Sequence, residues 1–152
     1  MTAAARLALA LILLAVSVTA EESHVIGIEK HWIAESPPGV HVAAAYGVIT
    51  CDCVRADRLV SVAVVGAAMS ELHATTSGDD GVVAMRRLDD GIAIDPGTSL
   101  VLEPGGLHIM IMGLEERPQA GDRIPVTLVF EKAGAVDVVF PVATRSAAGT
   151  EQ

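Results

Sequence analysis

One short run decides how this chain folds: GGLHIMIM, at residues 105–112. Side chains alternate between the two faces of a β-strand, so His108, Met110 and Met112 share one face while Ile109 and Ile111 share the other. The isoleucines are the natural core face. We therefore expect a strand whose second face offers one histidine and two thioethers to residues of a neighbouring strand.

Similar short β-branched runs recur between clusters of Gly, Pro and Asp, and helical signals are scarce. Many short strands separated by turn signals predict an all-β domain, built as an antiparallel sandwich or a Greek-key barrel. The expected strands cover residues 24–28, 41–50, 59–65, 70–75, 82–88, 99–102, 107–112, 125–130 and 136–142.

Residues 1–20 contain one charged side chain, Arg6, followed by an apolar run and then by Thr19 and Ala20. This pattern predicts a secretory signal peptide that is cleaved after Ala20. An uncleaved anchor is the alternative, but the apolar stretch is shorter than the roughly 20 residues that a membrane-spanning helix needs. The remaining residues, 21–152, suffice for one domain with its own core. We expect a periplasmic or otherwise extracytoplasmic protein with no stable membrane insertion after cleavage.

The mature chain is acidic. Only Arg6 of the 10 basic residues lies in the leader, so 9 remain against 19 acidic residues and the net charge is −10. Such a surface disfavours nucleic acid and anionic membranes as partners. Because the sequence contains no nucleophile elbow, phosphate loop or zinc-protease motif, we also expect no enzymatic turnover.

The two cysteines, Cys51 and Cys53, are separated by one residue and cannot crosslink distant parts of the fold. A reduced pair, a small-ring disulfide and a thiolate site for monovalent copper all stay open. A thiol-disulfide reductase acting through this pair is an alternative function. Its only basic neighbours, Arg55 and Arg58, give that alternative little support.

Two histidines and every methionine after the start codon lie within residues 69–112. Thioether sulfur is a poor ligand for zinc, calcium or magnesium but a good one for monovalent copper, and imidazole suits copper in either oxidation state. A turn rich in Gly and Asp joins the segments that hold His73 and Met85, which predicts a hairpin beside the strand of His108 and Met110. We expect these four side chains to converge on one copper site.

Several further segments also favour a copper-binding protein. They are HW at 31–32, SPPG at 36–39, DRLV at 57–60, ELH at 71–73, PGGLHIMIMGL at 104–114 and GD at 121–122. Together with the Gly-Gly turn before the His-x-Met motif, they make the chain resemble the PCuAC family of periplasmic copper chaperones. The resemblance covers nearly the whole mature chain and implies a cupredoxin-like β-barrel.

The resemblance also implies Cu(I) ligands at His73, Met85, His108 and Met110. It implies delivery of copper to an accepting protein, commonly the copper centre of a cytochrome oxidase. The intervals between these residues hold 11 and 22 residues, one more each than the family pattern, and surface turns can absorb the extra residue.

The other candidate ligands have less support. Met69 is expected to fill the core, and Met112 to pack beside the site or contribute to it. His24, His31 and His41 lie outside the motif, although His24 could join an amino-terminal metal-binding segment.

Two further functions compete with the chaperone. An electron-transfer cupredoxin needs a cysteine thiolate beside its two histidines, and no cysteine lies near His108 or Met110. A structural β-sandwich without metal, whose methionines only fill the core, is the third alternative.

Overall fold

The structure is a computed structural model that describes residues 24–78 and 81–148. The signal peptide predicted over residues 1–20 lies outside the described residues. Within the described part, no helix is long and apolar enough to cross a membrane.

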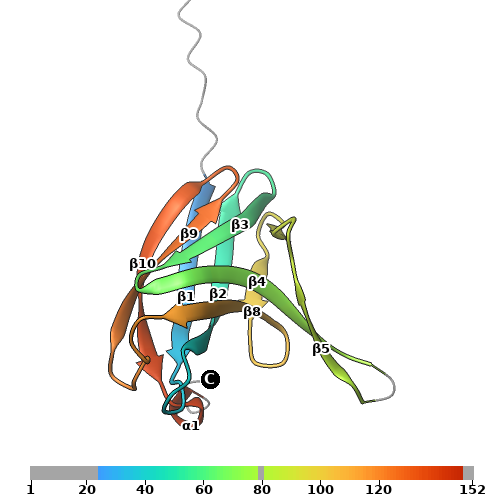
Figure 1. Ribbon diagram of the computed structural model, residues 1–152. Coiled ribbons are helices and arrows are strands. Elements are labelled where there is room, and N and C mark those ends of the chain that lie inside the picture. The colour runs from blue at the N-terminus through green and yellow to red at the C-terminus, as the bar shows by residue number, and fades with distance from the viewer. Residues whose placement is uncertain (1–23, 79–80, 149–152) are drawn as a thin grey trace, which may run out of the picture.

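Ten strands and one short helix make up the described chain (Figure 1). Their bounds are β1 His24–Ala34, β2 Val42–Cys53, β3 Asp57–Val64, β4 Ala67–Ser77, β5 Val83–Arg87, β6 Ile92–Ile94, β7 Ser99–Leu102, β8 Leu107–Leu114, β9 Arg123–Phe130, β10 Gly134–Ala143 and α1 Arg145–Ala148. All nine strands predicted from the sequence are present. Only β6 was not predicted, because three residues between two turns give no readable alternation.

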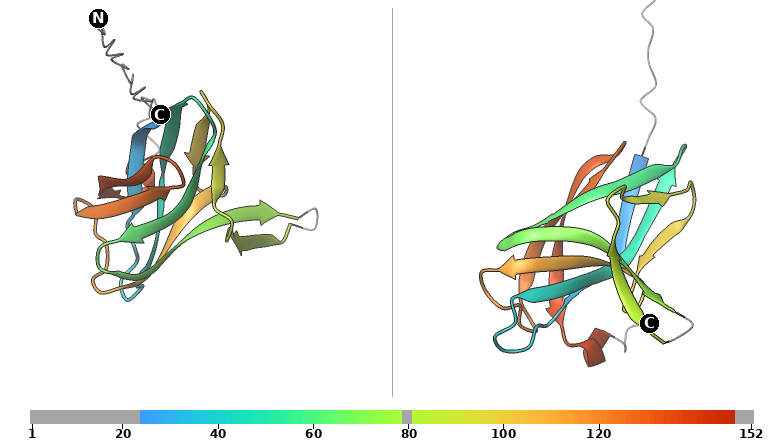
Figure 2. Two further views of the ribbon diagram at one scale, coloured as in Figure 1. Left: turned by 90° about the horizontal axis from the view of Figure 1, so that it is seen from above. Right: turned by 45° about the vertical axis from the view of Figure 1, so that its right-hand side comes forward.

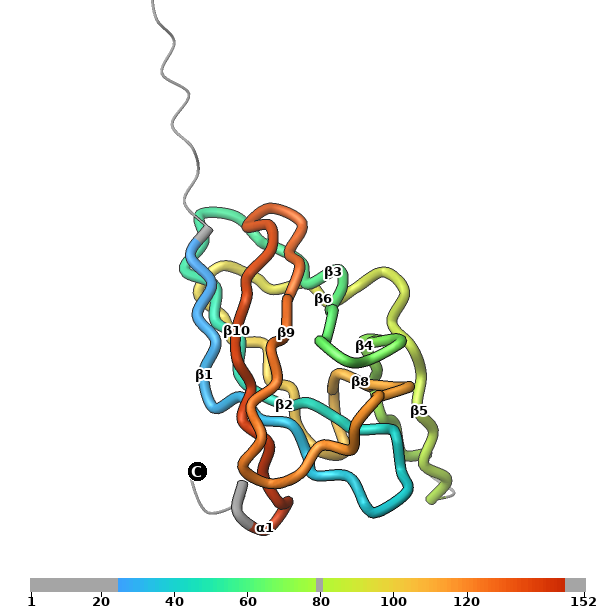
Figure 3. Tube along the Cα trace, turned by 60° about the vertical axis from the view of Figure 1, so that its left-hand side comes forward, coloured from blue at the N-terminus to red at the C-terminus, as the bar shows by residue number. Residues whose placement is uncertain are grey.

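The strands form two sheets that are joined through one pair of strands. One sheet has the order β5-β4-β8-β2-β1, with β7 also paired to β2, and the other has the order β10-β9-β3-β6. The joining pair is β1–β10, in which Ile33 lies opposite Val142 (Figure 3). This pair is parallel and all the others are antiparallel, so the described strands form a mixed sheet within the all-β class that the sequence predicts.

The inner faces of both sheets pack into one core. Ile109 and Ile111 are fully buried there, which confirms that the isoleucines of the GGLHIMIM run face inward. They lie in the same cluster as Leu128 and Phe130 of β9, from the opposite sheet. Burial of these side chains fixes which face of β8 points away from the core.

A long hairpin formed by β4 and β5 extends beyond the body of the domain (Figures 1 and 2). Its base in β4 pairs with β8, and all of β5 is exposed. The predicted hairpin between the His73 and Met85 segments is therefore confirmed.

Cys51 and Cys53 form a disulfide at the end of β2. Two residues apart on a strand, both side chains point to the same face, and here that face is the core, where Cys51 is 2% and Cys53 9% exposed. Their Cα atoms are 5.1 Å apart, within the usual range for a disulfide. Of the three alternatives for this pair, the structure has the small-ring disulfide.

Candidate metal site

The antiparallel pair of β4 and β8 sets the geometry of the candidate site. His73 lies directly opposite His108, and Glu71 lies directly opposite Met110. Opposed residues of an antiparallel pair point to the same face. Since Ile109 occupies the core face, both histidines, Glu71 and Met110 lie together on the outer face.

Hydrogen bonds assign the protons of both imidazoles. His73 Nε2 lies 2.8 Å from Glu71 Oε2, and His108 Nδ1 lies 3.1 Å from the carbonyl oxygen of Gly106. Both oxygens accept, so each of these nitrogens carries the proton that it donates. The free lone pairs of the neutral rings are then at Nδ1 of His73 and Nε2 of His108.

The Nδ1 atom of His73 is buried and has no hydrogen-bond partner within the described structure. Leaving a buried polar atom unpaired costs about 1–3 kcal/mol. Nδ1 of His31 is also buried and unpaired within the described residues, so the unpaired atom of His73 indicates a ligand only together with the opposed His108. A bound metal ion would satisfy the lone pair.

The spacing of the two rings fits an ion between them. Their centroids are 5.8 Å apart. A metal–nitrogen bond of about 2 Å places each ring centroid roughly 3 Å from the metal, so two imidazoles on one ion lie up to about 6 Å apart. His73 and His108 can therefore hold one ion without a large movement of either strand.

Glu71 orients His73 and is itself held in place. Its second carboxylate oxygen accepts a hydrogen bond of 2.7 Å from Arg87 on β5, and Arg87 also pairs with Asp89 at 2.6 Å. A carboxylate that accepts the outer N–H of a ligand histidine fixes the ring and raises its basicity. The sequence-based set did not assign a role to Glu71 or Arg87. The signal for Glu71 was its position, two residues before His73 on the same strand face.

The two methionines of the predicted set differ in placement. Met110 is half-buried on β8, on the same face as His108. Met85 lies on β5 opposite Thr75, and Arg87 is the residue directly opposite His73. Met85 therefore shares the outer face but lies diagonally from His73 and is 61% exposed.

Met69 does not fill the core. It lies opposite Met112 in the same strand pair and is 52% exposed, so the expectation of a core methionine was wrong. The reason is strand alternation, which puts Met69 on the side of Glu71 and His73 while Leu72 faces inward. Met112 is half-buried beside it.

Aromatic side chains close one side of the site. The ring of Tyr46 on β2 lies 6.5 Å from that of His108 and 4.8 Å from that of Trp32 on β1. Burial raises the pKa of the Tyr46 phenol above its ordinary value, opposed by the positive charge of Arg145. The neutral phenol therefore persists beside His108 over the physiological pH range.

Two of the other histidines serve elsewhere. A ring nitrogen of His31 lies 3.2 Å from the carbonyl oxygen of Val139, and one of His41 lies 2.7 Å from that of Leu114. In the described chain, no three His, Cys, Asp or Glu side chains gather as a metal site. The ligands available to a metal are thus a mixture of imidazole and thioether, the set that selects copper among common ions.

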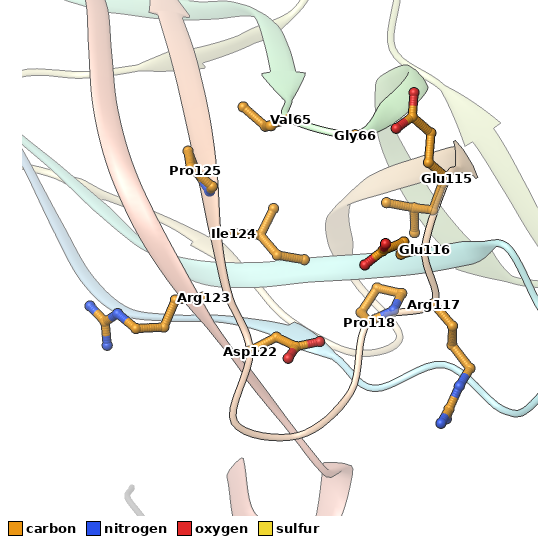
Figure 4. Close-up of a pocket in the computed structure, with 11 residues that line it drawn as sticks. Val65, Gly66, Glu115, Glu116, Arg117, Pro118, Asp122, Arg123, Ile124 and Pro125 are labelled. Carbon is orange, nitrogen blue, oxygen red and sulfur yellow. The ribbon is translucent and has the colours of Figure 1, made fainter.

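A pocket lies at the far end of these strands, between the β3–β4 turn, the segment after β8 and the start of β9 (Figure 4). Its charged lining residues are Glu115, Glu116, Arg117, Asp122 and Arg123. No histidine, methionine or cysteine lines it, so this pocket offers nothing to a soft metal.

Comparison with solved structures defines the class of this fold. The copper-bound PCuAC domain from PmoF2 is 27% identical, with a TM-score of 0.66 over 82% of this chain and 99% of that domain. The solution structure of CuI-DR1885 from Deinococcus radiodurans is 26% identical, with a TM-score of 0.61 over 86% of this chain and 84% of that one. The fold is therefore that of PCuAC domains, as the resemblance predicted.

The family can be stated more narrowly. Residues 26–142 match the family model described as "LpqE-like: Putative lipoprotein LpqE-like". The "Putative lipoprotein Lxx21020" of Leifsonia xyli subsp. xyli (strain CTCB07) is 32% identical over 117 residues, which are 77% of this chain and 69% of that protein. This chain belongs to the LpqE-like family.

Proposed function

We propose that this protein binds Cu(I) outside the cytoplasm and passes it to another copper protein. The observation that carries the proposal is the pair of opposed histidines with centroids 5.8 Å apart, one of which has a buried nitrogen without a partner. The similar PCuAC domain of PmoF2 and DR1885 were solved with copper bound, which supports the same cargo here.

His73 Nδ1, His108 Nε2 and the sulfur of Met110 are the proposed central ligands, and Met85 completes the set from the hairpin. Met85 is exposed and lies diagonally from His73, a spacing of about 7–8 Å between Cα atoms that a long flexible side chain can span. All four ligands are neutral, so the ion keeps its single positive charge. Part of that charge is balanced by Glu71, which hydrogen-bonds to His73.

This ligand set suits a carrier. Thioethers bind the soft Cu(I) ion without the strong bond that a thiolate makes, so an acceptor with stronger ligands can remove it. The exposed Met85 on the projecting hairpin is the ligand that an acceptor reaches first. We propose a copper-accepting protein as the partner, with the copper centre of a cytochrome oxidase as the specific candidate.

The word lipoprotein in the family's description agrees with the extracytoplasmic location expected from the leader. No observation favours the reductase alternative, because both cysteines are buried in an oxidised pair. Cys51 also lies far from the proposed site. It is seven residues along β2 from Ala44, the residue opposite Met110, which is a distance of about 23 Å, and its side chain faces the core.

The test is a Cu(I) titration against a colorimetric chelator. Wild type should bind one tight equivalent, and the double variant His108→Ala, Met110→Ala should lose it. His31→Gln is a matched control, since this histidine lies on another part of the domain, and it should bind as wild type does. Equal binding by the double variant and wild type would contradict the proposed site.

A further inference from the structure

A second group of thioethers lies beside the proposed site. Met69 and Met112 are directly opposite each other. They lie two residues along their strands from the opposed pair Glu71 and Met110, on the same face. Met69 is 52% exposed and Met112 half-buried, and neither belongs to the hydrophobic core. Core packing therefore does not explain these two methionines.

Their geometry allows both sulfurs to reach one ion. Directly opposed Cβ atoms lie about 4.5–5.5 Å apart, and each methionine has three rotatable side-chain bonds. Two sulfurs bound to one ion at about 2.3 Å lie roughly 4 Å apart, which these side chains can reach. Met110, two residues before Met112 on the same face, supplies a third sulfur.

The surroundings favour a soft monovalent ion over a harder one. On the other side of β8, Met112 lies opposite Val42 and Met110 opposite Ala44, both apolar. The carboxylate of Glu71 is already paired with His73 and Arg87. Three neutral thioethers in such a setting attract Cu(I) or Ag(I) and discriminate against Zn²⁺, Ca²⁺ and Mg²⁺.

We infer that Met69, Met112 and the shared Met110 form a second, weaker site for monovalent copper. Its role as a station for entry or exit of the ion rests on the proposed function, while the site itself does not. In the transfer step, the bonds to His73, His108 and Met85 break and bonds to the sulfurs of Met69 and Met112 form. Met110 stays bound throughout, and neither the charge nor the oxidation state of the ion changes.

The experiment uses Ag(I), a soft monovalent ion that replaces Cu(I) and does not oxidise in air, and NMR of protein labelled with ¹³C at the methionine methyls. Single Met→Leu variants assign the signals. The first equivalent of Ag(I) should shift the signals of Met110 and Met85. Further Ag(I), which binds Met69 and Met112 while Met110 stays with the first ion, should shift the signals of those two methionines.

Two variants separate this site from the first one. Met69→Leu, Met112→Leu should abolish the second event and keep the first. His73→Ala, His108→Ala should abolish the first event and keep the shifts of Met69 and Met112, and Met85→Leu should keep the second event as a matched control. Met69 and Met112 signals that never move in wild type, while Met110 responds, would overturn the second site and leave the proposed function standing. Loss of the Met69 and Met112 shifts in the histidine variant would also overturn an independent second site.

Discussion

At the scale of single residues, the site depends on which atom of each histidine is free. Glu71 and the carbonyl of Gly106 each accept a hydrogen bond from a proton-bearing nitrogen, and this leaves one lone pair per ring on the outer face. The choice of His73, His108 and Met110 as Cu(I) ligands stays a prediction, but the shared face of His108 and Met110 was predictable from strand alternation. The proton assignment was not, because it depends on a carboxylate and a carbonyl whose distances only the folded chain defines.

Glu71→Ala should weaken Cu(I) binding about 10- to 100-fold, the usual cost of losing the partner that orients a ligand histidine. Glu71→Gln should lose less, since the amide oxygen still accepts from His73 Nε2. Chelator competition measures both affinities. Wild-type affinity in Glu71→Ala would show that this carboxylate has no part in positioning His73.

Tyr46 is the only tyrosine of the chain, so its ionisation can be followed by ultraviolet absorbance alone. Burial raises its pKa, and the phenolate should form only above the ordinary pKa of about 10. The folded chain then holds this proton more tightly than the unfolded chain. Its contribution to stability is complete below about pH 10 and is lost as the pH rises through the folded-state pKa.

Protein unfolded in urea is the control for this titration, and it should titrate at the ordinary tyrosine pKa. Tyr46→Phe should show no phenolate signal at all. An identical midpoint in folded and unfolded protein would contradict the buried position of Tyr46 beside His108.

At the scale of elements, the pairing of β4 with β8 creates the outer face that holds the proposed ligands, and Gly113 ends this face. This glycine has φ +64°, and a Cβ at its position would lie 2.7 Å from the Cβ of Ala68. Leu114 lies two residues after the outward-facing Met112, so regular alternation would place it on the outer face. It is buried instead, because the chain turns at Gly113. The sequence showed the alternation, but it could not show the register that puts His73 opposite His108.

Gly113→Ala should destabilise the domain by more than the roughly 1–2 kcal/mol that a left-handed conformation costs a residue with a side chain, because the contact with Ala68 adds to it. Gly97→Ala is the matched control, since Gly97 has φ +70° and a Cβ added there would meet no atom within 4 Å. Urea unfolding measures both variants. Equal losses in the two would show that crowding at Ala68 costs nothing.

The disulfide at the end of β2 should contribute little to stability and nothing to metal binding. The entropic estimate for closing such a short loop is below about 2 kcal/mol. Cys51→Ser, Cys53→Ser should therefore bind Cu(I) as wild type does, as measured by chelator competition. A thiol assay under denaturing, non-reducing conditions should detect no free thiol in wild type. Loss of the Cu(I) equivalent in the double variant would show that the cysteines bind Cu(I).

At the scale of the whole molecule, two sheets share one core, and the pairing of β4 with β8 places His73, His108 and Met110 on the outer face. The all-β class and nearly every strand could be predicted, because short alternating runs between turn residues are a local signal. The β4–β5 hairpin was predicted too, but the parallel β1–β10 pair and the projection of the hairpin beyond the domain body could not be, since both depend on contacts between segments far apart in sequence. The exposed Met69 was mispredicted because the expected strand began at residue 70, so the alternation that puts Met69 on the face of Glu71 and His73 was not applied to it.

The most direct test of the central claim is X-ray absorption spectroscopy of the complex with one equivalent of Cu(I), using Cys51→Ser, Cys53→Ser so that any sulfur signal comes from thioether. We predict imidazole nitrogen and thioether sulfur together around the ion, with the imidazole scattering lost in His73→Ala, His108→Ala. An environment with sulfur alone, or with nitrogen and oxygen alone, would contradict a Cu(I) site built from His73, His108 and Met110.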